Sequence, residues 1–356
     1  MVTVQKLSSV VKRLEQNYIP KAKRRRFRLG INQLTLSEFT SLNTAGRRST
    51  ANRSTGENRI RRLVDDVQLS DQLQQLLLTE ALGSRYGYWY CSLDHSQFGP
   101  FCIAVLAVSN RAGRAIPLWV QVNVSEAALI APLLTALEEL FWFLGEAAPH
   151  LKLVLVMDRW FASDRLFTLF AEHDISFIAR SKGNKLVQLP WDPSWWKEPL
   201  GDISNEELEI QYRSHQLRFV RSDYRHGMKG DEVWFLLTNL PIPSSKGATD
   251  GLTRRQILNR YAERFEIEEA FKDVKWLQRL KWQQVRKPEV IRSLLLFVFL
   301  GWWLLWRYIA TQLPKQKAHP KKMLSWFRQA WEYLQWILRT PLLPPLRATQ
   351  QIEEKK

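Results

Sequence analysis

Tyr88–Val124 reads YWYCSLDHSQFGPFCIAVLAVSNRAGRAIPLWVQVNV and holds three apolar runs separated by turn-forming residues such as Asn110 and Gly113. The runs are rich in β-branched and aromatic side chains, which favour extended backbone. They are Tyr88–Leu93, Phe101–Val108 and Ala115–Val124. Successive runs joined by short turns pair antiparallel, so this stretch predicts a three-stranded meander.

The residues that follow predict a layered α/β fold. An amphipathic helix over 126–144 precedes a buried strand, Leu151–Met157, and a helix over 163–173 precedes a strand over 175–179. Three antiparallel strands followed by helix, strand, helix and strand form one mixed sheet with flanking helices. This order is the one used by ribonuclease-H-like nucleases, and we therefore expect a ribonuclease-H-like mixed sheet.

Proline and glycine interrupt the pattern after residue 182, and short alternating runs over 208–213, 217–221 and 233–237 then predict a β-rich insertion. Helices are predicted over 254–275, 288–311 and 321–339, and the N-terminal region is also helical. Five regions are expected: a basic helical DNA-binding domain (1–80), a first part of the catalytic core (81–182), the β-rich insertion (183–251), a second part of the core (252–312), and a C-terminal helical region with its tail (313–356).

The formal net charge of +17 points to a polyanionic partner, either nucleic acid or an anionic membrane surface. Residues 1–62 hold 15 Lys and Arg against three Glu, which accounts for +12 of the total. Such a helical, basic region is typical of a module that binds DNA phosphates, and a solvated basic arm is the alternative. The candidate phosphate-binding residues are Arg24, Arg25, Arg26, Arg53 and Arg59.

The segment Leu294–Trp306 (LLLFVFLGWWLLW) tests the membrane alternative. It has 13 uncharged residues, whereas a membrane-spanning helix needs about 20, so a buried core helix is expected. Two cysteines and the absence of a signal-peptide pattern at the start of the sequence predict a reducing cytoplasm.

Two aspartates follow apolar strands: Asp94 ends YWYCSL, and Asp158 ends LKLVLVM. A carboxylate at the mouth of a sheet is held on a rigid scaffold and can bind a hard divalent cation through oxygen. Aspartate is equally common as a turn residue after a strand, so neither residue decides the chemistry alone.

The helix predicted over 254–275 places Tyr261, Arg264, Glu268 and Lys275 on an arc of about 60°. One face would thus carry a carboxylate beside three side chains that donate hydrogen bonds to phosphate, and Lys272 falls close to the same arc. The neighbouring acids Glu263, Glu266, Glu269 and Asp273 point elsewhere. A solvated helix face with ion pairs between successive turns is the alternative.

The spacing Tyr261-x2-Arg264-x3-Glu268-x6-Lys275 resembles the Y-R-E-K signature of DDE transposases from bacterial insertion sequences of the insertion-sequence-4 family. Asp94 in LDHS and Asp158 in MDRWF are similar to the first two catalytic aspartates of that family, and Glu268 would be the third acid. The segment from Arg53 to Arg59 resembles the region that binds transposon ends.

The resemblance implies a cut-and-paste transposase that binds the terminal inverted repeats of its element and transfers cut ends to target DNA. The three acids would hold two Mg²⁺ ions, with Mn²⁺ as a substitute, and Tyr261, Arg264, Lys275 and Lys272 would bind phosphates. Trp234 matches a tryptophan on which some family members stack a flipped base, although a tryptophan in a strand is more often part of the core. The resemblance also implies a homodimer that pairs two DNA ends and a nucleoid-associated prokaryotic protein with no membrane partner. A non-catalytic DNA-binding regulator derived from a transposase is the alternative.

Overall fold

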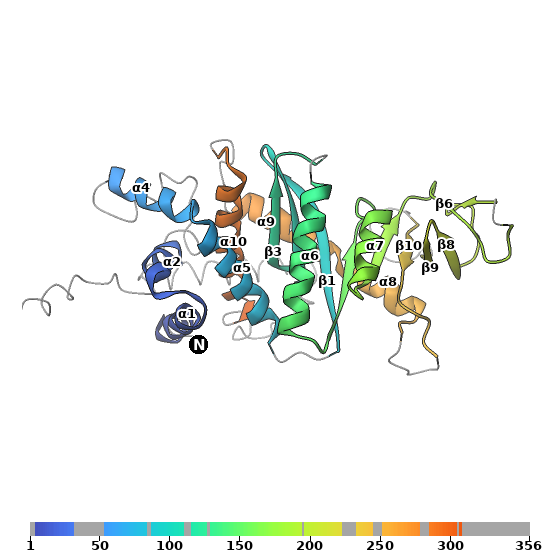
Figure 1. Cartoon of the computed structure of the whole chain (residues 1–356), viewed down its shortest axis with the longest axis horizontal. Helices are drawn as coiled ribbons and strands as arrows, with labels where there is room; N and C mark the ends of the chain where they lie inside the picture. Colours follow the sequence, from blue (N-terminus) through green and yellow to red (C-terminus); the bar gives the residue numbers. More distant parts are fainter. Residues whose placement is uncertain are drawn as a thin grey trace, which may run out of the picture.

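The computed structural model describes residues 4–31, 53–83, 87–109, 115–126, 129–193, 196–222, 233–244, 251–277, 285–304 and 306–307. An eight-stranded mixed sheet lies at the middle of an elongated molecule, with helices on both of its faces (Figure 1). The sheet has the order β3-β2-β1-β4-β5-β10-β9-β8. Its strands are β1 (Gly87–Phe98), β2 (Phe101–Ser109), β3 (Ala115–Asn123), β4 (Leu151–Met157), β5 (Ser176–Ser181), β8 (Glu207–Tyr212), β9 (His215–Arg221) and β10 (Phe235–Thr238).

The predicted meander is confirmed, since β1, β2 and β3 pair antiparallel in order. Gly99, at φ +59°, allows the tight turn between β1 and β2 because it lacks a Cβ. The strands predicted over 151–157 and 175–179 are also present as β4 and β5, and both run parallel to β1. The prediction of a mixed α/β sheet is therefore confirmed.

The β-rich segment after residue 182 lies in the same sheet. Its strands β8, β9 and β10 are antiparallel to their neighbours, and β10 pairs with the otherwise open edge of β5. A short separate ladder joins β6 (Leu186–Val187) to β7 (Glu198–Pro199). The insertion thus lengthens the sheet at the end far from the N-terminal helices (Figure 1).

Successive side chains of β4 point to opposite faces of the sheet and pack into two different hydrophobic cores. Leu153, Leu155 and Met157 belong to the larger core, which includes α6 (Ile130–Ala147) and α7 (Asp164–Glu172). Val154 and Val156 belong to a second core, with Trp234 and Tyr261. The period of two along a strand separates the residues in this way.

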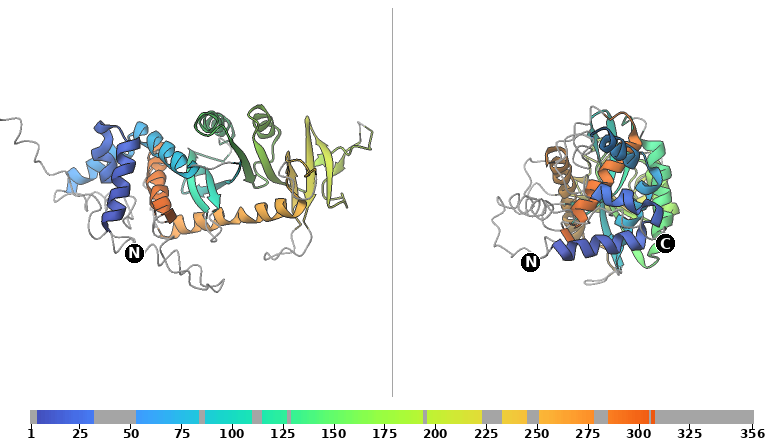
Figure 2. Two further views of the ribbon diagram at one scale, coloured as in Figure 1. Left: turned by 90° about the horizontal axis from the view of Figure 1, so that it is seen from below. Right: turned by 90° about the vertical axis from the view of Figure 1, so that its left-hand side faces the viewer.

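The second face is covered by α8 (Arg254–Glu263) and α9 (Phe265–Leu277), which run end to end along the sheet (Figure 2). The helix predicted over 254–275 is present as two helices in line, which meet at Arg264, whose backbone also has helical angles of φ −56° and ψ −35°. A capping box between Thr253 and Gln256 starts α8, so two donors at the helix start are satisfied.

The apolar segment that begins at Leu294 forms most of α10 (Pro288–Leu304). This helix packs against β3 and α5 (Val67–Leu82). Ser293 on α10 donates to the carbonyl of Val64 at 2.7 Å, and its hydroxyl lies 2.5 Å from that of Ser70. The expectation of a core helix is confirmed, and within the described ranges no helix is long and apolar enough to cross a membrane. The predicted helix over 321–339 and the tail lie outside the described residues.

The remaining N-terminal helices are α1 (Val4–Tyr18), α2 (Arg24–Gly30) and α4 (Arg53–Val64), with a 3-10 turn, η1, at Lys21–Lys23. They lie at one end of the molecule beside α5 and α10 (Figure 1). The helical character expected for this region is confirmed for the described residues.

Candidate active site

The first two acids are brought together by strand pairing. β1 and β4 run parallel with Leu93 opposite Met157, so the next residues along each strand are Asp94 and Asp158. Asp94 is buried, at 6% exposure, and one of its oxygens accepts the backbone N–H of His95 at 2.8 Å. Parallel pairing thus sets two carboxylates, 64 residues apart in sequence, side by side.

Glu268 joins them through Arg264. The Nη1 of Arg264 donates to Asp94 Oδ2 at 2.5 Å, and its Nη2 donates to Glu268 Oε1 at 2.8 Å. The spacing of four residues on the helix allows the second bond, and the position of α9 against β1 allows the first. One guanidinium therefore links the first and third predicted acids.

The environment of Arg264 is aromatic as well as ionic. The side chain is 3% exposed, and its Cζ lies 4.6 Å from the ring centre of Phe265 and 5.5 Å from that of Tyr261. Burial alone would lower the pKa of this guanidinium, but Tyr261 and the carboxylates of Asp94, Asp158 and Glu268 raise it. Arg264 is consequently a permanent cation at the centre of the acidic cluster.

The three carboxylates repel one another. Burial, and to a smaller extent the charges of Asp158 and Glu268, raise the pKa of Asp94 to about 6 against the opposing effects of Arg264 and the His95 N–H. The Oδ1 of Asp158 is buried and accepts no hydrogen bond within the described part of the chain. The cluster therefore has more acceptor capacity than its one arginine satisfies.

As arranged, the described residues contain no group of three or more His, Cys, Asp or Glu side chains that could hold a metal ion. The donor chemistry nevertheless fits a hard cation, since the three acids offer only oxygen and Asp158 has an unmatched buried oxygen. In this structure the positive charge among them comes from Arg264.

The other acids near Glu268 have partners on different faces, within the described residues. Glu263 accepts two bonds from Arg260 at 3.0 and 3.1 Å. Glu266 accepts the hydroxyl of Ser109 at 2.7 Å. Glu269 accepts from Lys272 at 2.6 Å. Of the four glutamates at 263, 266, 268 and 269, Glu268 is the one bonded to Arg264.

The structure places Tyr261 and Trp234 in the second core. Tyr261 is fully buried, and its ring meets that of Trp234 edge-on at 4.9 Å. Trp234 is 5% exposed and also contacts Phe265 at 5.9 Å. Burial raises the pKa of Tyr261 to about 12, and its hydroxyl has no hydrogen-bond partner among the described atoms. Tyr261 thus keeps a proton that it can donate.

The two lysines differ. Lys272 is exposed and paired with Glu269, whereas Lys275 lies on α9 and its side chain is outside the described atoms. The structure therefore brings Asp94, Asp158, Arg264, Glu268 and Tyr261 together, with Trp234 behind Tyr261.

The basic residues of the N-terminal helices are partly committed to internal contacts. Arg24 donates to the carbonyls of Ile19 and Gln16, and Arg26 joins Lys23 in an ion pair with Asp66. Arg25 and Arg59 are exposed. Arg53 begins α4, and its side chain is not among the described atoms.

His95 was not singled out from the sequence. Its ring lies 4.0 Å from Asp94, 3.6 Å from Glu126 and 4.6 Å, centre to centre, from Trp160. Burial lowers the pKa of His95, while Glu126 raises it. Its position directly after Asp94 on β1 could have indicated that His95 lies at the site, but the histidines of the sequence show no metal-ligand spacing.

A family model described as "Transposase DDE domain" matches residues 94–304, which is more than half of the chain and spans all three acids. Among solved structures, the cryo-EM structure of a piggyBac transposase synaptic complex with hairpin DNA is similar, with a TM-score of 0.40 and 11% identity. That match covers 99% of this chain and 80% of the other. No curated protein matches the sequence.

Proposed function

This chain belongs to the family of transposases with a DDE domain, and from that premise we propose that Asp94, Asp158 and Glu268 are the catalytic acids of a DNA-cutting and DNA-joining reaction. The observation that carries the proposal is the bridge from Arg264 to both Asp94 and Glu268, beside the paired strand end that bears Asp158. We place the protein in the insertion-sequence-4 family through its Y-R-E-K spacing, and its core among ribonuclease-H-like folds.

The three acids would hold two Mg²⁺ ions, with Mn²⁺ as a substitute. Such ions activate the attacking oxygen and stabilise the leaving oxygen during in-line displacement at phosphorus. The contribution of the chain itself is positional. Asp94 and Asp158 are fixed by the sheet, and Glu268 is fixed by the helix that lies across it. This rigidity holds the donor oxygens in one place while DNA is exchanged.

The donors beside the acids would hold the DNA backbone. Arg264 offers a planar fork suited to phosphate, and the Tyr261 hydroxyl has no partner among the described atoms; both side chains are buried, so they would contact phosphate only after the surrounding core opens. Lys275 and Lys272 would extend this phosphate-binding face along α9. Arg264, which bonds to Asp94 and Glu268 in this structure, would be available to a DNA phosphate where cations neutralised these two carboxylates.

Trp234 would act on a flipped base only if its ring left the core formed with Tyr261 and Phe265. Stacking on an extruded base is worth about 1–3 kcal/mol, which is comparable to the cost of exposing part of an indole. We therefore assign Trp234 to support of Tyr261 first and to base stacking second.

Binding of the terminal inverted repeats is assigned to residues 1–80, where Arg25 and Arg59 are exposed and Arg24, Arg26 and Arg53 lie on the same helices. The full cycle would be cut-and-paste transposition by a homodimer that pairs two ends before transfer to target DNA. We expect the protein in the prokaryotic cytoplasm, associated with the nucleoid when bound to DNA.

The test is cleavage of a supercoiled plasmid that carries the inverted repeats flanking the gene, in the presence of Mg²⁺. Asp158→Asn and Glu268→Gln should each lower the cleavage rate by at least about 100-fold. Loss of a residue that only hydrogen-bonds to a metal ligand already costs about 10–100-fold, and loss of the ligand itself should cost more. Glu263→Gln and Glu269→Gln are matched controls, since these acids pair with Arg260 and Lys272 instead.

Cleavage by Asp158→Asn and Glu268→Gln at the same rate as by the control variants Glu263→Gln and Glu269→Gln would refute the catalytic assignment. Tight binding of the ends by the parent protein, with no cleavage in Mg²⁺ or Mn²⁺, would identify a non-catalytic regulator instead.

A further inference from the structure

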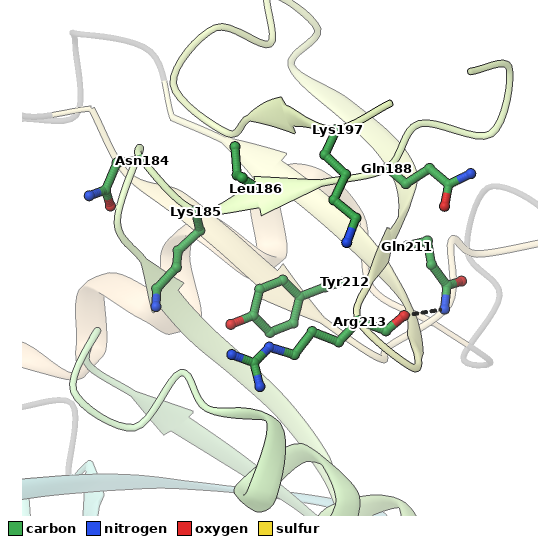
Figure 3. Close-up of a pocket in the computed structure, with 8 residues that line it drawn as sticks. All are labelled: Asn184, Lys185, Leu186, Gln188, Lys197, Gln211, Tyr212 and Arg213. Atoms are coloured by element: carbon green, nitrogen blue, oxygen red, sulfur yellow. Dashed lines mark hydrogen bonds between the residues drawn. The ribbon is translucent and has the colours of Figure 1, made fainter. Parts of the chain in front are cut away.

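A basic pocket of about 440 Å³ opens in the insertion, away from the three acids (Figure 3). Lys185 lies just before β6, Lys197 just before β7, and Arg213 at the turn that follows β8. In Figure 3 the charged ends of these three residues lie around the ring of Tyr212. The lining includes three cationic side chains and no acidic one.

The pocket is built on ordered backbone. Antiparallel pairing of β6 with β7 holds Lys185 and Lys197 at opposite ends of one short ladder, and the carbonyl of Lys185 accepts the backbone N–H of Leu200 at 2.9 Å. Gln188 and Gln211 exchange two backbone hydrogen bonds at 2.8 and 2.9 Å, which fastens this ladder to β8. Arg213 adopts φ +55°, a conformation that few residues other than glycine tolerate, and its carbonyl accepts Gln211 Nε2 at 2.9 Å.

Much of the positive charge in the pocket is open to solvent. Arg213 is 62% exposed and has one long ion pair, 3.6 Å from Asp164. Lys197 is exposed and Lys185 half-buried, and neither forms an ion pair within the described residues. Cations that are not neutralised by the protein attract phosphates.

The loop between β6 and β7 adds exposed indoles. Trp191 and Trp196 are 63% and 49% exposed, whereas Trp89, Trp119, Trp234, Trp302 and Trp303 are buried. Trp196 directly precedes Lys197, and Trp191 follows Gln188 by three residues. Aromatic side chains beside lysine and arginine are the usual composition of surfaces that bind single-stranded nucleic acid, because bases stack on the rings while cations hold the backbone.

We propose that this pocket and its loop form a second DNA site that binds an unpaired strand, with Lys185, Lys197 and Arg213 on the phosphates and Trp191 and Trp196 on the bases. The inference rests on the proposed function in that DNA is the substrate. Four strand spacings separate β8 from β4, which is about 19 Å or roughly six base-pair steps. Asp164, the partner of Arg213, begins α7 six residues after Asp158, so the second site is joined to the catalytic loop.

The probe is a fluorescein-labelled oligothymidylate of about 20 nucleotides, a length that exceeds the footprint of typical single-strand sites. Binding to the full chain bearing Glu268→Gln is followed by anisotropy across a salt series. Lys185→Gln/Lys197→Gln should lower the slope of log affinity against log salt by about 1.4, because each lost phosphate contact removes about 0.7. The control Lys152→Gln/Arg165→Gln removes the same charge from exposed sites elsewhere and should leave the slope unchanged.

The indoles are tested separately. Trp191→Ala and Trp196→Ala should each weaken oligothymidylate binding by about fivefold or more, since stacking is worth at least about that factor per base. Trp142→Ala is the matched control, because Trp142 is 64% exposed on α6. Thermal melting of every variant verifies that the fold is intact.

Unchanged oligothymidylate binding in the pocket variants, with plasmid cleavage retained by the parent chain, would overturn this inference and leave the proposed function standing. Loss of binding in the pocket variants, without any plasmid cleavage by the parent, would keep the site and refute the catalytic proposal. A change of oligomeric state in the tryptophan variants with unaltered DNA binding would show a protein interface and also overturn the inference.

Discussion

Arg264 and Asp94 form a buried ion pair across 170 residues of sequence, with Nη1 and Oδ2 2.5 Å apart. Both side chains are under 10% exposed. The pair joins the helix layer to the sheet, and the bond from Arg264 to Glu268 extends it to the helix surface. Stability and the readiness of the acidic cluster for cations are therefore coupled through one guanidinium.

Loss of Arg264 should destabilise the protein. Arg264→Gln leaves the buried charge of Asp94 without its partner, and breaking a buried pair on one side costs about 3–5 kcal/mol. Urea unfolding at pH 7 measures the change. Lys272→Gln is the control, because its pair with Glu269 is exposed and worth at most about 1 kcal/mol. Similar losses in the two variants would show that the Arg264 bridge carries no special stability.

Asp94 should give stability a pH dependence of unusual sign. Its pKa is raised by burial from 3.8 to about 6, so the folded state holds the proton more tightly than the unfolded state. This contribution is complete below pH 3.8 and is lost as pH rises through about 6, with a total on the order of 3 kcal/mol. The difference in unfolding free energy between the parent and Asp94→Asn, measured in EDTA, should therefore fall from pH 4 to pH 7. A flat or rising difference would contradict the assignment.

Trp234 should contribute more to stability than the exposed tryptophans. Its indole fills the core between Tyr261 and Phe265, and truncation of a buried tryptophan to alanine costs about 3–5 kcal/mol. Trp191→Ala, at an exposed site, should change stability by no more than about 0.5 kcal/mol. Urea unfolding of both variants decides this. Equal, small effects would mean that the Trp234 ring is free to leave the core and serve a base.

Local sequence patterns were enough to predict the strands and to predict which residues share the polar face of the helix that carries Glu268. The apolar runs before Asp94 and Asp158 predicted two strands from their β-branched and aromatic residues, and Asp158 does follow β4. The expectation that Asp94 ends its strand was wrong, because β1 continues to Phe98 and Asp94 lies opposite Val105 of β2 within the ladder. The helical repeat put Arg264 and Glu268 on one face, as their bond now shows. Both features depend on neighbours within a few residues.

Long-range partners could not be predicted in this way. The pairing of Leu93 with Met157, and the contact of Arg264 with Asp94, depend on how distant segments pack. The β-rich insertion was predicted, but its place in the sheet was not: β10 pairs with β5, whose edge would otherwise leave backbone groups unpaired. Lys185, Lys197 and Arg213 have no linear spacing that predicts a shared pocket.

Arg25 and Arg24 offer a matched test of the basic N-terminal helices. Arg25 is exposed on α2 and makes no ion pair among the described residues, whereas Arg24 donates to the carbonyls of Ile19 and Gln16. With a duplex that carries the inverted repeat, Arg25→Gln should lower the salt slope of binding by about 0.9, the value of one phosphate contact on B-DNA. Arg24→Gln should change the slope by less than half as much, because part of its hydrogen-bonding capacity is already used inside the protein. Equal slopes for the parent and Arg25→Gln would exclude Arg25 from the phosphate contacts.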